Sequence, residues 1–305
     1  MGEGSWGWTN PDYTPQAESA PGGPTGRQVR LVLVATLLIA AALLAYTVLG
    51  ADNGGKGSAL NPIAQAAEKT AHYPGERMRM TGSFTAPGSP VTLQLHGSGA
   101  YNGTTQRGRF DMTIDNLLPT GSFTMKEVVD EDGFYIGSPQ FAGRLPAGKT
   151  WVRLDASSDD ATGSAISQGD PRQQLEALES VSNAIATVGT ESIDGHRTTH
   201  YSAQIGVDKE VDQMRAAGDD KAADDLEQIA EQTGIANIPV EAWIDDRGLL
   251  RRMAMTVPVP NDLGRQINLN LDMYFFDFGG HPSIETPPPA RVYETSTFDL
   301  DALTQ

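Results

Sequence analysis

The feature that most constrains the fold of this chain is the alternation of apolar and polar residues along several short segments. Residues 78–84, 91–95, 110–114 and 267–275 each carry their apolar side chains at alternate positions, with polar ones between them. Successive side chains of a strand point to opposite faces, so this period of two predicts strands with one apolar face. Turn dipeptides such as Asn102-Gly103 and Asp132-Gly133 separate the segments, which predicts an antiparallel sheet of successive hairpins.

Other segments predict helices and further strands. Asn61-Pro62, a capping residue before proline, predicts a helix over 62–71. Apolar spacing predicts a second helix near 175–185, and a charged stretch over 209–232 predicts a third, broken at Gly218. Strands are expected at 196–205, 239–245, 249–257 and 266–278, with a hairpin at Asp246-Arg247-Gly248 and a short strand or helix at the proline-rich C-terminus. Because these elements are interleaved, we expect one α+β domain over residues 60–305.

An uninterrupted apolar run precedes this domain. Residues 31–49 contain no charge, proline or glycine, and as a helix they would span roughly 28 Å, close to the thickness of a bilayer core. Arg27 and Arg30 precede the run, which predicts a cytoplasmic N-terminus. We therefore expect a disordered cytoplasmic tail (1–30), one transmembrane helix (31–50), a flexible tether (51–59) and an extracytoplasmic domain, all at the cell membrane. A cleaved signal peptide is the alternative, but its apolar core would be shorter.

Composition excludes several classes of function. The chain of 305 residues has no cysteine, so it forms no disulfide, no thiolate metal site and no lipid-modified cysteine. Its 39 acidic and 22 basic residues give a net charge of −17. Such a surface repels phosphate backbones and anionic lipid head groups, so we expect no nucleic-acid partner.

No catalytic or cofactor-binding motif is present, and we expect neither an enzyme nor a cofactor. His196 and His200 are four residues apart, but on a strand they would lie about 13 Å from one another. We therefore interpret them as ordinary surface or edge residues and expect no metal site. Asn102-Gly103-Thr104 matches a glycosylation motif, although Asn-Gly is also a turn dipeptide, and we favour the turn.

The order of elements and two short segments resemble a known family. Residues 192–201 (SIDGHRTTHY) and the hairpin at 238–252 (IPVEAWIDDRGLLRR) follow a capped helix, a β-meander and a second helix. Together they resemble the actinobacterial LppX/LprG type of lipoprotein and, more distantly, the LolA-like lipid carriers. The resemblance covers roughly residues 61–278. It implies a strongly curved antiparallel sheet, a half-barrel with helices over its open side, which holds acylated molecules in an apolar cavity. Here the apolar helix would replace the lipid-modified cysteine as the anchor.

Methionine placement fits either a packed core or a cavity. Seven of the nine methionines fall in predicted strands, mainly on the apolar faces. Methionine is flexible and polarizable, so it fills irregular space in a core and also adapts to varied acyl chains. If the resemblance holds, the cavity would be lined by these residues: Leu93, Leu95, Phe110, Met112, Ile114, Met125, Met253, Met255, Leu269, Leu271 and Met273.

Two functions follow. The first is a non-catalytic, membrane-anchored binding protein for acylated lipids or lipoglycans, which requires a cavity of several hundred Å³. The alternative is a ligand-free interaction or sensor module of the cell envelope, coupled to the cytoplasmic tail through Trp6, Trp8 or Tyr13.

Overall fold

The computed structural model of the chain describes residues 62–295, apart from residues 72, 86–91, 119–120, 131–132, 155–184, 217–219 and 261–265. The predicted tail, transmembrane helix and tether lie outside the described residues. Among the helices that are described, none is long and apolar enough to cross a membrane.

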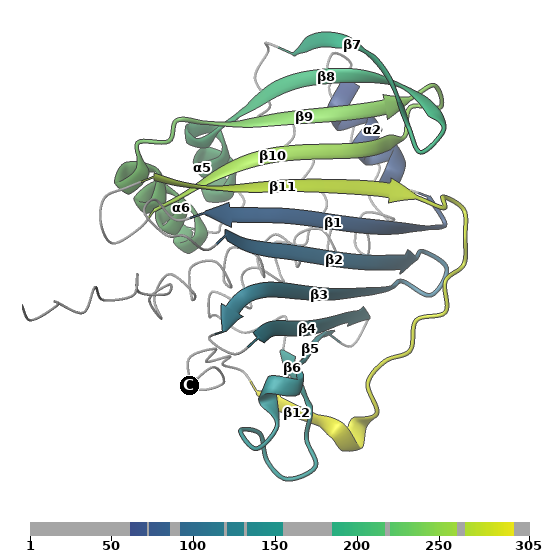
Figure 1. Ribbon diagram of the computed structural model, residues 1–305, viewed down its shortest axis with the longest axis vertical. Helices are drawn as coiled ribbons and strands as arrows, with labels where there is room; N and C mark the ends of the chain where they lie inside the picture. Colours follow the sequence, from purple (N-terminus) through teal and green to yellow (C-terminus); the bar gives the residue numbers. More distant parts are fainter. Residues whose placement is uncertain are drawn as a thin grey trace, which may run out of the picture.

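Twelve strands form one sheet in the order β12-β6-β5-β4-β3-β2-β1-β11-β10-β9-β8-β7 (Figure 1). The first six are β1 (Gly75–Thr85), β2 (Thr92–Asn102), β3 (Arg107–Leu118), β4 (Gly121–Asp130), β5 (Gly133–Gly137) and β6 (Trp151–Leu154). The other six are β7 (Ala186–Ile193), β8 (His196–Gly206), β9 (Asn237–Asp245), β10 (Leu250–Pro260), β11 (Gln266–Phe276) and β12 (Val292–Thr295). Every neighbouring pair of these strands is antiparallel except β12 with β6. The largely antiparallel sheet predicted from the alternation is confirmed.

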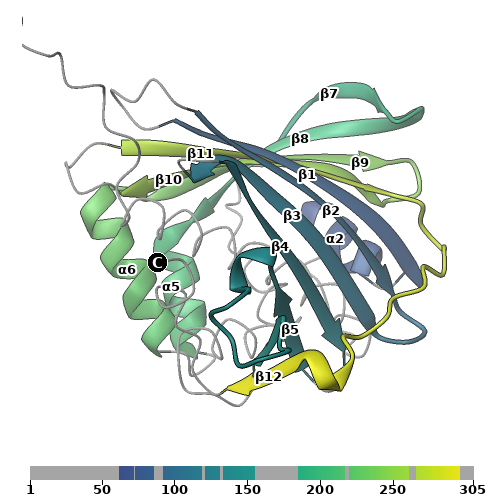
Figure 2. The same cartoon turned by 60° about the horizontal axis from the view of Figure 1, so that its bottom comes forward.

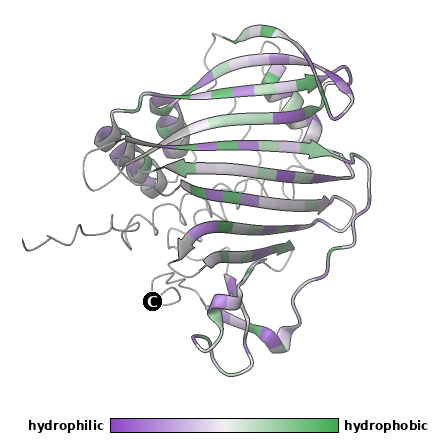
Figure 3. Cartoon of the chain, in the orientation of Figure 1, coloured by the Kyte–Doolittle hydropathy of each residue, from purple (hydrophilic) through white to green (hydrophobic). Residues whose placement is uncertain are grey.

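The sheet is strongly curved, and its strands alternate between hydrophobic and hydrophilic residues (Figures 2 and 3). We call the side that carries Met78, Met80 and Phe84 of β1 the apolar face, and the side that carries Arg77, Arg79 and Thr81 the polar face. The main buried cluster of the domain is built on the apolar face. One apolar and one polar face were predicted from the alternation of apolar and polar residues, and the sheet has both.

Three α-helices are described: α2 (Pro62–Ala71), α5 (Val207–Ala216) and α6 (Asp220–Thr233). The bounds of α2 are those predicted. The third predicted helix corresponds to α5 and α6, and Gly218, where a break was predicted, lies outside the described residues. Helix α2 packs Ile63 and Ala66 into the main buried cluster, and the Leu250 backbone N–H donates to Thr70 Oγ1 at 2.9 Å. Helices α5 and α6 form a cluster of their own at the other end of the strands (Figure 2). The described helices thus lie at the two ends of the curved sheet.

Strand β7 was not predicted, and it begins one residue after the helix expected near 175–185. Ile185 is not helical; it immediately precedes β7, and the rest of the predicted helix lies outside the described residues. Strands β7 and β8 join through Asp194 (φ 48°) and Gly195 (φ 81°). Asp-Gly with two positive φ values is the two-residue turn that suits the twist of a hairpin. The Asp194-Gly195 dipeptide was a sequence signal from which this hairpin, and with it β7, could have been predicted.

The predicted hairpin between β9 and β10 is confirmed, and a carboxylate organises its turn. Asp245 Oδ1 accepts hydrogen bonds from the backbone N–H groups of Arg247 and Leu249, both at 2.9 Å. Asp245 Oδ2 accepts from Arg251 Nε at 2.8 Å, and both of these charged side chains are almost fully buried. Gly248 supplies the positive φ of 75° that the turn requires.

The C-terminal segment returns along the polar face to the far edge of the sheet. Strand β11 ends at Phe276, two residues earlier than predicted, and Gly279 N–H then donates to the Gly75 carbonyl. Farther on, Ile284 and Val292 pack against Val128 and Tyr135 in a second buried cluster. The segment then becomes β12, which pairs in parallel with β6. The sequence left a short strand or a helix open here, and the structure has a strand, in a parallel pairing that local pattern could not indicate.

Candidate ligand-binding face

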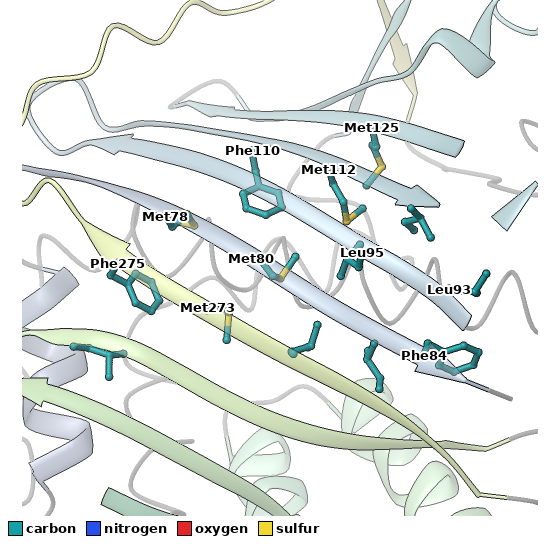
Figure 4. Packing of buried hydrophobic residues seen from close by; sticks show 14 of the residues in the cluster. Met78, Met80, Phe84, Leu93, Leu95, Phe110, Met112, Met125, Met273 and Phe275 are labelled. Carbon is teal, nitrogen blue, oxygen red and sulfur yellow. The ribbon is translucent and has the colours of Figure 1, made fainter. Parts of the chain in front are cut away.

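A row of methionines crosses the middle of the apolar face. In the register of the sheet, Met253 lies opposite Met273, and Met273 lies opposite Met80. On the other side of Met80 the row continues through Gly97, Met112 and Met125 on β2, β3 and β4. We call these five methionines the methionine row: Met80, Met112, Met125, Met253 and Met273. Five of the six adjacent strands from β10 to β4 therefore contribute to one band of flexible thioether side chains, and Figure 4 shows Met273, Met80, Met112 and Met125 of this band.

All the residues predicted to line a cavity lie on this face, in rows parallel to the methionine row. The next row contains Met255, Leu271, Leu95 and Ile114, and Leu269 and Leu93 follow in a third. Nine of the eleven predicted residues belong to the main buried cluster, while Met253 and Met255 are partly buried and pack against it. The structure brings the predicted set together on one surface. Whether a ligand occupies it stays a prediction. Met78, Met80 and Phe123 share the face and were not in the predicted set.

Two glycines on β2 make room for an aromatic ring on the same face. Phe110 lies opposite Gly99 in the sheet and is 1% exposed. A Cβ atom on Gly97 or Gly99 would overlap the Phe110 ring, at distances that real contacts do not show. The ring therefore lies flat over the backbone of β2, next to the methionine row.

Two carboxyl groups are buried on the apolar face, and sequence reasoning missed both. Glu76 is in phase with Met78 and Met80 on β1, and Glu127 is in phase with Met125 on β4. Glu76 is 2% exposed and Glu127 0%. Burial raises the pKa of each to about 8, because desolvation penalises the charged form. An acidic residue at an apolar position of an alternating segment was the signal that could have identified them.

The polar face carries a ladder of stacked cations and rings in one register. The His200 ring stacks on the Trp243 ring, with ring centroids 4.2 Å apart. The Arg252 guanidinium lies 4.1 Å from the centre of the same Trp243 ring. Arg252 also makes two hydrogen bonds to Asp272, at 2.8 and 2.6 Å. The ladder continues to β11 and β1, where the Arg79 guanidinium lies 4.3 Å from the Tyr274 ring centre. These contacts join strands β8, β9, β10, β11 and β1 and stabilise the sheet.

His200 corrects the expectation of two ordinary surface or edge histidines. His196 is exposed, but the His200 side chain is only 9% exposed. Carboxylate oxygens of Glu191 and Glu241 lie 3.1 and 3.4 Å from its two ring nitrogens, although neither contact has hydrogen-bond geometry. Asp194, in the β7–β8 turn, reaches the Arg79 guanidinium on β1 at 3.1 Å. The hairpin therefore folds over the polar face, and the resulting burial of His200 depends on tertiary structure.

The expected turn at Asn102-Gly103 is present. Asn102 Oδ1 accepts from the backbone N–H groups of Thr104 and Thr105, at 3.0 and 3.2 Å. Its amide nitrogen donates to the Pro282 carbonyl at 2.9 Å, and the residue is 7% exposed. The amide nitrogen that glycosylation would modify is therefore engaged in the fold.

Two hollows are described, and the first of them is lined mostly by residues of the polar face but also by Met255 and Leu271 of the predicted set. One, of about 470 Å³, lies on the polar face between β9 and β2 and is lined by residues such as Thr81, Glu241 and Asn270. The other, of about 390 Å³, lies between α5 and α6 and is lined by Arg215 and several acidic residues. The predicted cavity on the apolar face stays a prediction. In the described parts of the chain, no group of three or more His, Asp or Glu residues is placed to hold a metal ion.

Comparisons with known proteins find a likeness in structure only. No family model matches the sequence, and no curated protein matches it. The solved structure of lipoprotein LppX from Mycobacterium tuberculosis is 14% identical, with 74% of this chain and 97% of that one covered and a TM-score of 0.43. LprF from Mycobacterium bovis is 16% identical, with 76% and 99% covered and a TM-score of 0.41. The resemblance predicted from the order of elements is thus found as a structural similarity over most of the chain. At these scores it assigns no ligand.

Proposed function

We propose that this chain is a non-catalytic binding protein for acylated lipids or lipoglycans, which holds their acyl chains against the apolar face of its curved sheet. The observation that carries the proposal is the methionine row. Five methionines from five strands meet in one register on one face, beside rows of leucine, isoleucine and phenylalanine. A surface of unbranched, polarizable side chains adapts to acyl chains of different length and saturation. A family that the order of elements resembles binds molecules of this kind.

Acyl chains would supply the binding free energy, and charge would contribute little. Each methylene group removed from water contributes about 0.8 kcal/mol, so one C16 chain could offset the cost of association. The net charge of −17 disfavours attraction between the protein surface and anionic head groups. We further propose that the apolar run at 31–50 anchors the chain in the cell membrane, with the domain from residue 60 onward outside the cell.

Photoreactive methionine tests this proposal at the residues that carry it. The full-length chain would be produced in its own host with photo-methionine, irradiated in isolated membranes, purified and digested. We expect acyl-lipid adducts on peptides that contain Met80, Met112 or Met273. Met214 belongs to helix α5 and to no strand of the sheet, and it serves as an internal control.

The distribution of adducts decides between the two functions considered. Adducts on the methionine row and not on Met214 would support lipid binding. If the row carries no lipid adduct, the proposal is wrong, and a ligand-free interaction or sensor module becomes the better explanation of a filled apolar core.

A further inference from the structure

Two carboxyl groups on the apolar face are buried without a hydrogen bond in the described structure. Neither oxygen of Glu76 and neither oxygen of Glu127 has a hydrogen-bond partner among the described residues. The two residues are 2% and 0% exposed. A polar group buried without a hydrogen bond destabilises a fold, so folded proteins satisfy nearly all of them. Both residues therefore carry a cost to stability that the described structure does not offset.

The register of the sheet shows what surrounds each group. Glu127 on β4 lies between Phe110 on β3 and Ile136 on β5, one row from the methionine row. Glu76 on β1 lies opposite Tyr101 on β2. Three strand spacings separate β1 from β4, which is about 14 Å across the sheet. The two carboxyl groups are therefore too far apart to share one proton or one ligand atom.

The same burial determines which ligand groups these carboxyls suit. A pKa of about 8 means that each is mainly protonated at neutral pH, so it presents an uncharged O–H donor to the apolar face. A neutral donor suits an uncharged acceptor oxygen, and it offers no ionic attraction to a cationic head group. The ester carbonyl is such an acceptor, and every ester-linked acyl chain carries one.

We propose that Glu76 and Glu127 are the polar contacts of the acyl-binding face, each donating its carboxyl hydrogen to a separate ester carbonyl of a neutral lipid with more than one acyl chain. This inference rests on the proposed function and narrows its ligand to uncharged acyl esters. The apolar rows would hold the chains, and the two carboxyls would set the depth at which the ester groups lie. Once a ligand is bound, both buried carboxyls would have partners.

A pair of matched ligands tests the inference directly. The full-length chain, reconstituted in lipid nanodiscs, would be irradiated with a photoreactive triacylglycerol or with its trialkyl ether, which lacks only the carbonyl oxygens. We expect the ester to be captured roughly ten- to a hundredfold better than the ether, because the ether loses both hydrogen bonds of a buried site and each is worth up to about tenfold. Glu76→Met and Glu127→Met should each reduce this preference, and together they should abolish it. Glu76→Gln and Glu127→Gln should retain part of it, because the amide still donates a hydrogen bond.

Glu241→Met is the matched control, because this glutamate lies on the polar face and is half exposed. It should leave the preference for the ester unchanged. Equal capture of ester and ether by the unaltered chain would overturn the inference while leaving acyl binding in place, as would an unchanged preference in both methionine variants. Capture of neither ligand by the unaltered, folded chain would instead contradict the proposed function. If a methionine variant fails to fold, the glutamine variants and the comparison of the two ligands still decide.

Discussion

At the scale of single residues, the buried ionisable groups are of two kinds, those with strong partners and those without. Burial alone would raise the pKa of Asp245, but hydrogen bonds from Leu249 and Arg251 outweigh it, and the net effect is a lowered pKa. Glu76 and Glu127 have no such bonds, so desolvation decides and raises both pKa values to about 8. Buried carboxyl groups thus have pKa values shifted in opposite directions in one protein, because, of these three, only the carboxylate of Asp245 accepts hydrogen bonds that stabilise its charged form.

The raised pKa values predict that the chain loses stability as the pH rises from about 5 to about 8. An unfolded glutamate has a pKa near 4.5, so in this window the folded form keeps a proton that the unfolded form has released. The free energy of unfolding should then fall by up to about 1.4 kcal/mol per pH unit for each group. Urea unfolding at pH 5, 6, 7 and 8 would measure this slope.

The double variant Glu76→Gln and Glu127→Gln should flatten that slope and unfold at higher urea concentration at pH 8. Glu285→Gln, at an exposed position, should keep the slope of the unaltered chain. A double variant whose stability falls with pH as steeply as before would show that both carboxyls are ionised in the folded protein.

At the scale of elements, the sheet depends on close fits between rows as well as on its hydrogen bonds. Strand β2 contributes Gly97 to the methionine row, where every other strand from β10 to β4 contributes a methionine. The Phe110 ring occupies the space that a side chain at position 97 would need. Glycine has a low preference for strands, and its presence here follows from this close approach.

We predict that Gly97→Val destabilises the domain by about 1–3 kcal/mol, because the added side chain overlaps the Phe110 ring in a packed core. Thermal unfolding of the purified chain would measure the loss. Gly189→Val is the matched control on β7, where an added Cβ atom meets no heavy atom within 4 Å. Combining the Gly97 change with Phe110→Leu should recover part of the stability. Equal effects of valine at both glycines would contradict the packing argument.

At the scale of the whole molecule, one continuous sheet carries both ends of the described chain. Helix α2 lies directly before β1 at the centre of the sheet, and β12 closes its edge after a long return. A tether before α2 would connect the middle of the domain to the proposed membrane helix. The single-domain prediction for residues 60–305 agrees with this continuity and stays a prediction.

The proposed anchor predicts that the full-length chain remains in the membrane fraction after washing with high salt or carbonate. Protease added outside intact cells should digest the domain from residue 60 onward and leave the tail protected. The reason is the apolar run at 31–49 with Arg27 and Arg30 before it. A mature N-terminus near Ala51, found by mass spectrometry, would show that the run is a cleaved signal peptide.

Much of the fold and the lining of the candidate site could be predicted from the sequence, because both follow from short-range pattern. Alternation places Met112 and Leu271 on the apolar face of their strands whatever the strands pair with, since side chains alternate along any strand. The bounds of α2 and the turn after Asp245 also follow from neighbouring residues alone. Ile185, the last residue of a predicted helix, is not helical, and the rest of that predicted helix lies outside the described residues.

Only the tertiary structure decided which strands lie side by side and in what register. No local pattern could align methionines from β10, β11, β1, β3 and β4, which are up to 193 residues apart, because register between distant segments depends on the complete packing of the sheet. The burial of His200 under the β7–β8 hairpin and the parallel pairing of β12 are decided in the same way. The two buried glutamates show the difference most clearly. The sequence by itself determined that Glu76 and Glu127 are in phase with the apolar side chains of their strands. Whether their carboxyl groups are buried away from water, and are therefore protonated, depends on the assembled sheet.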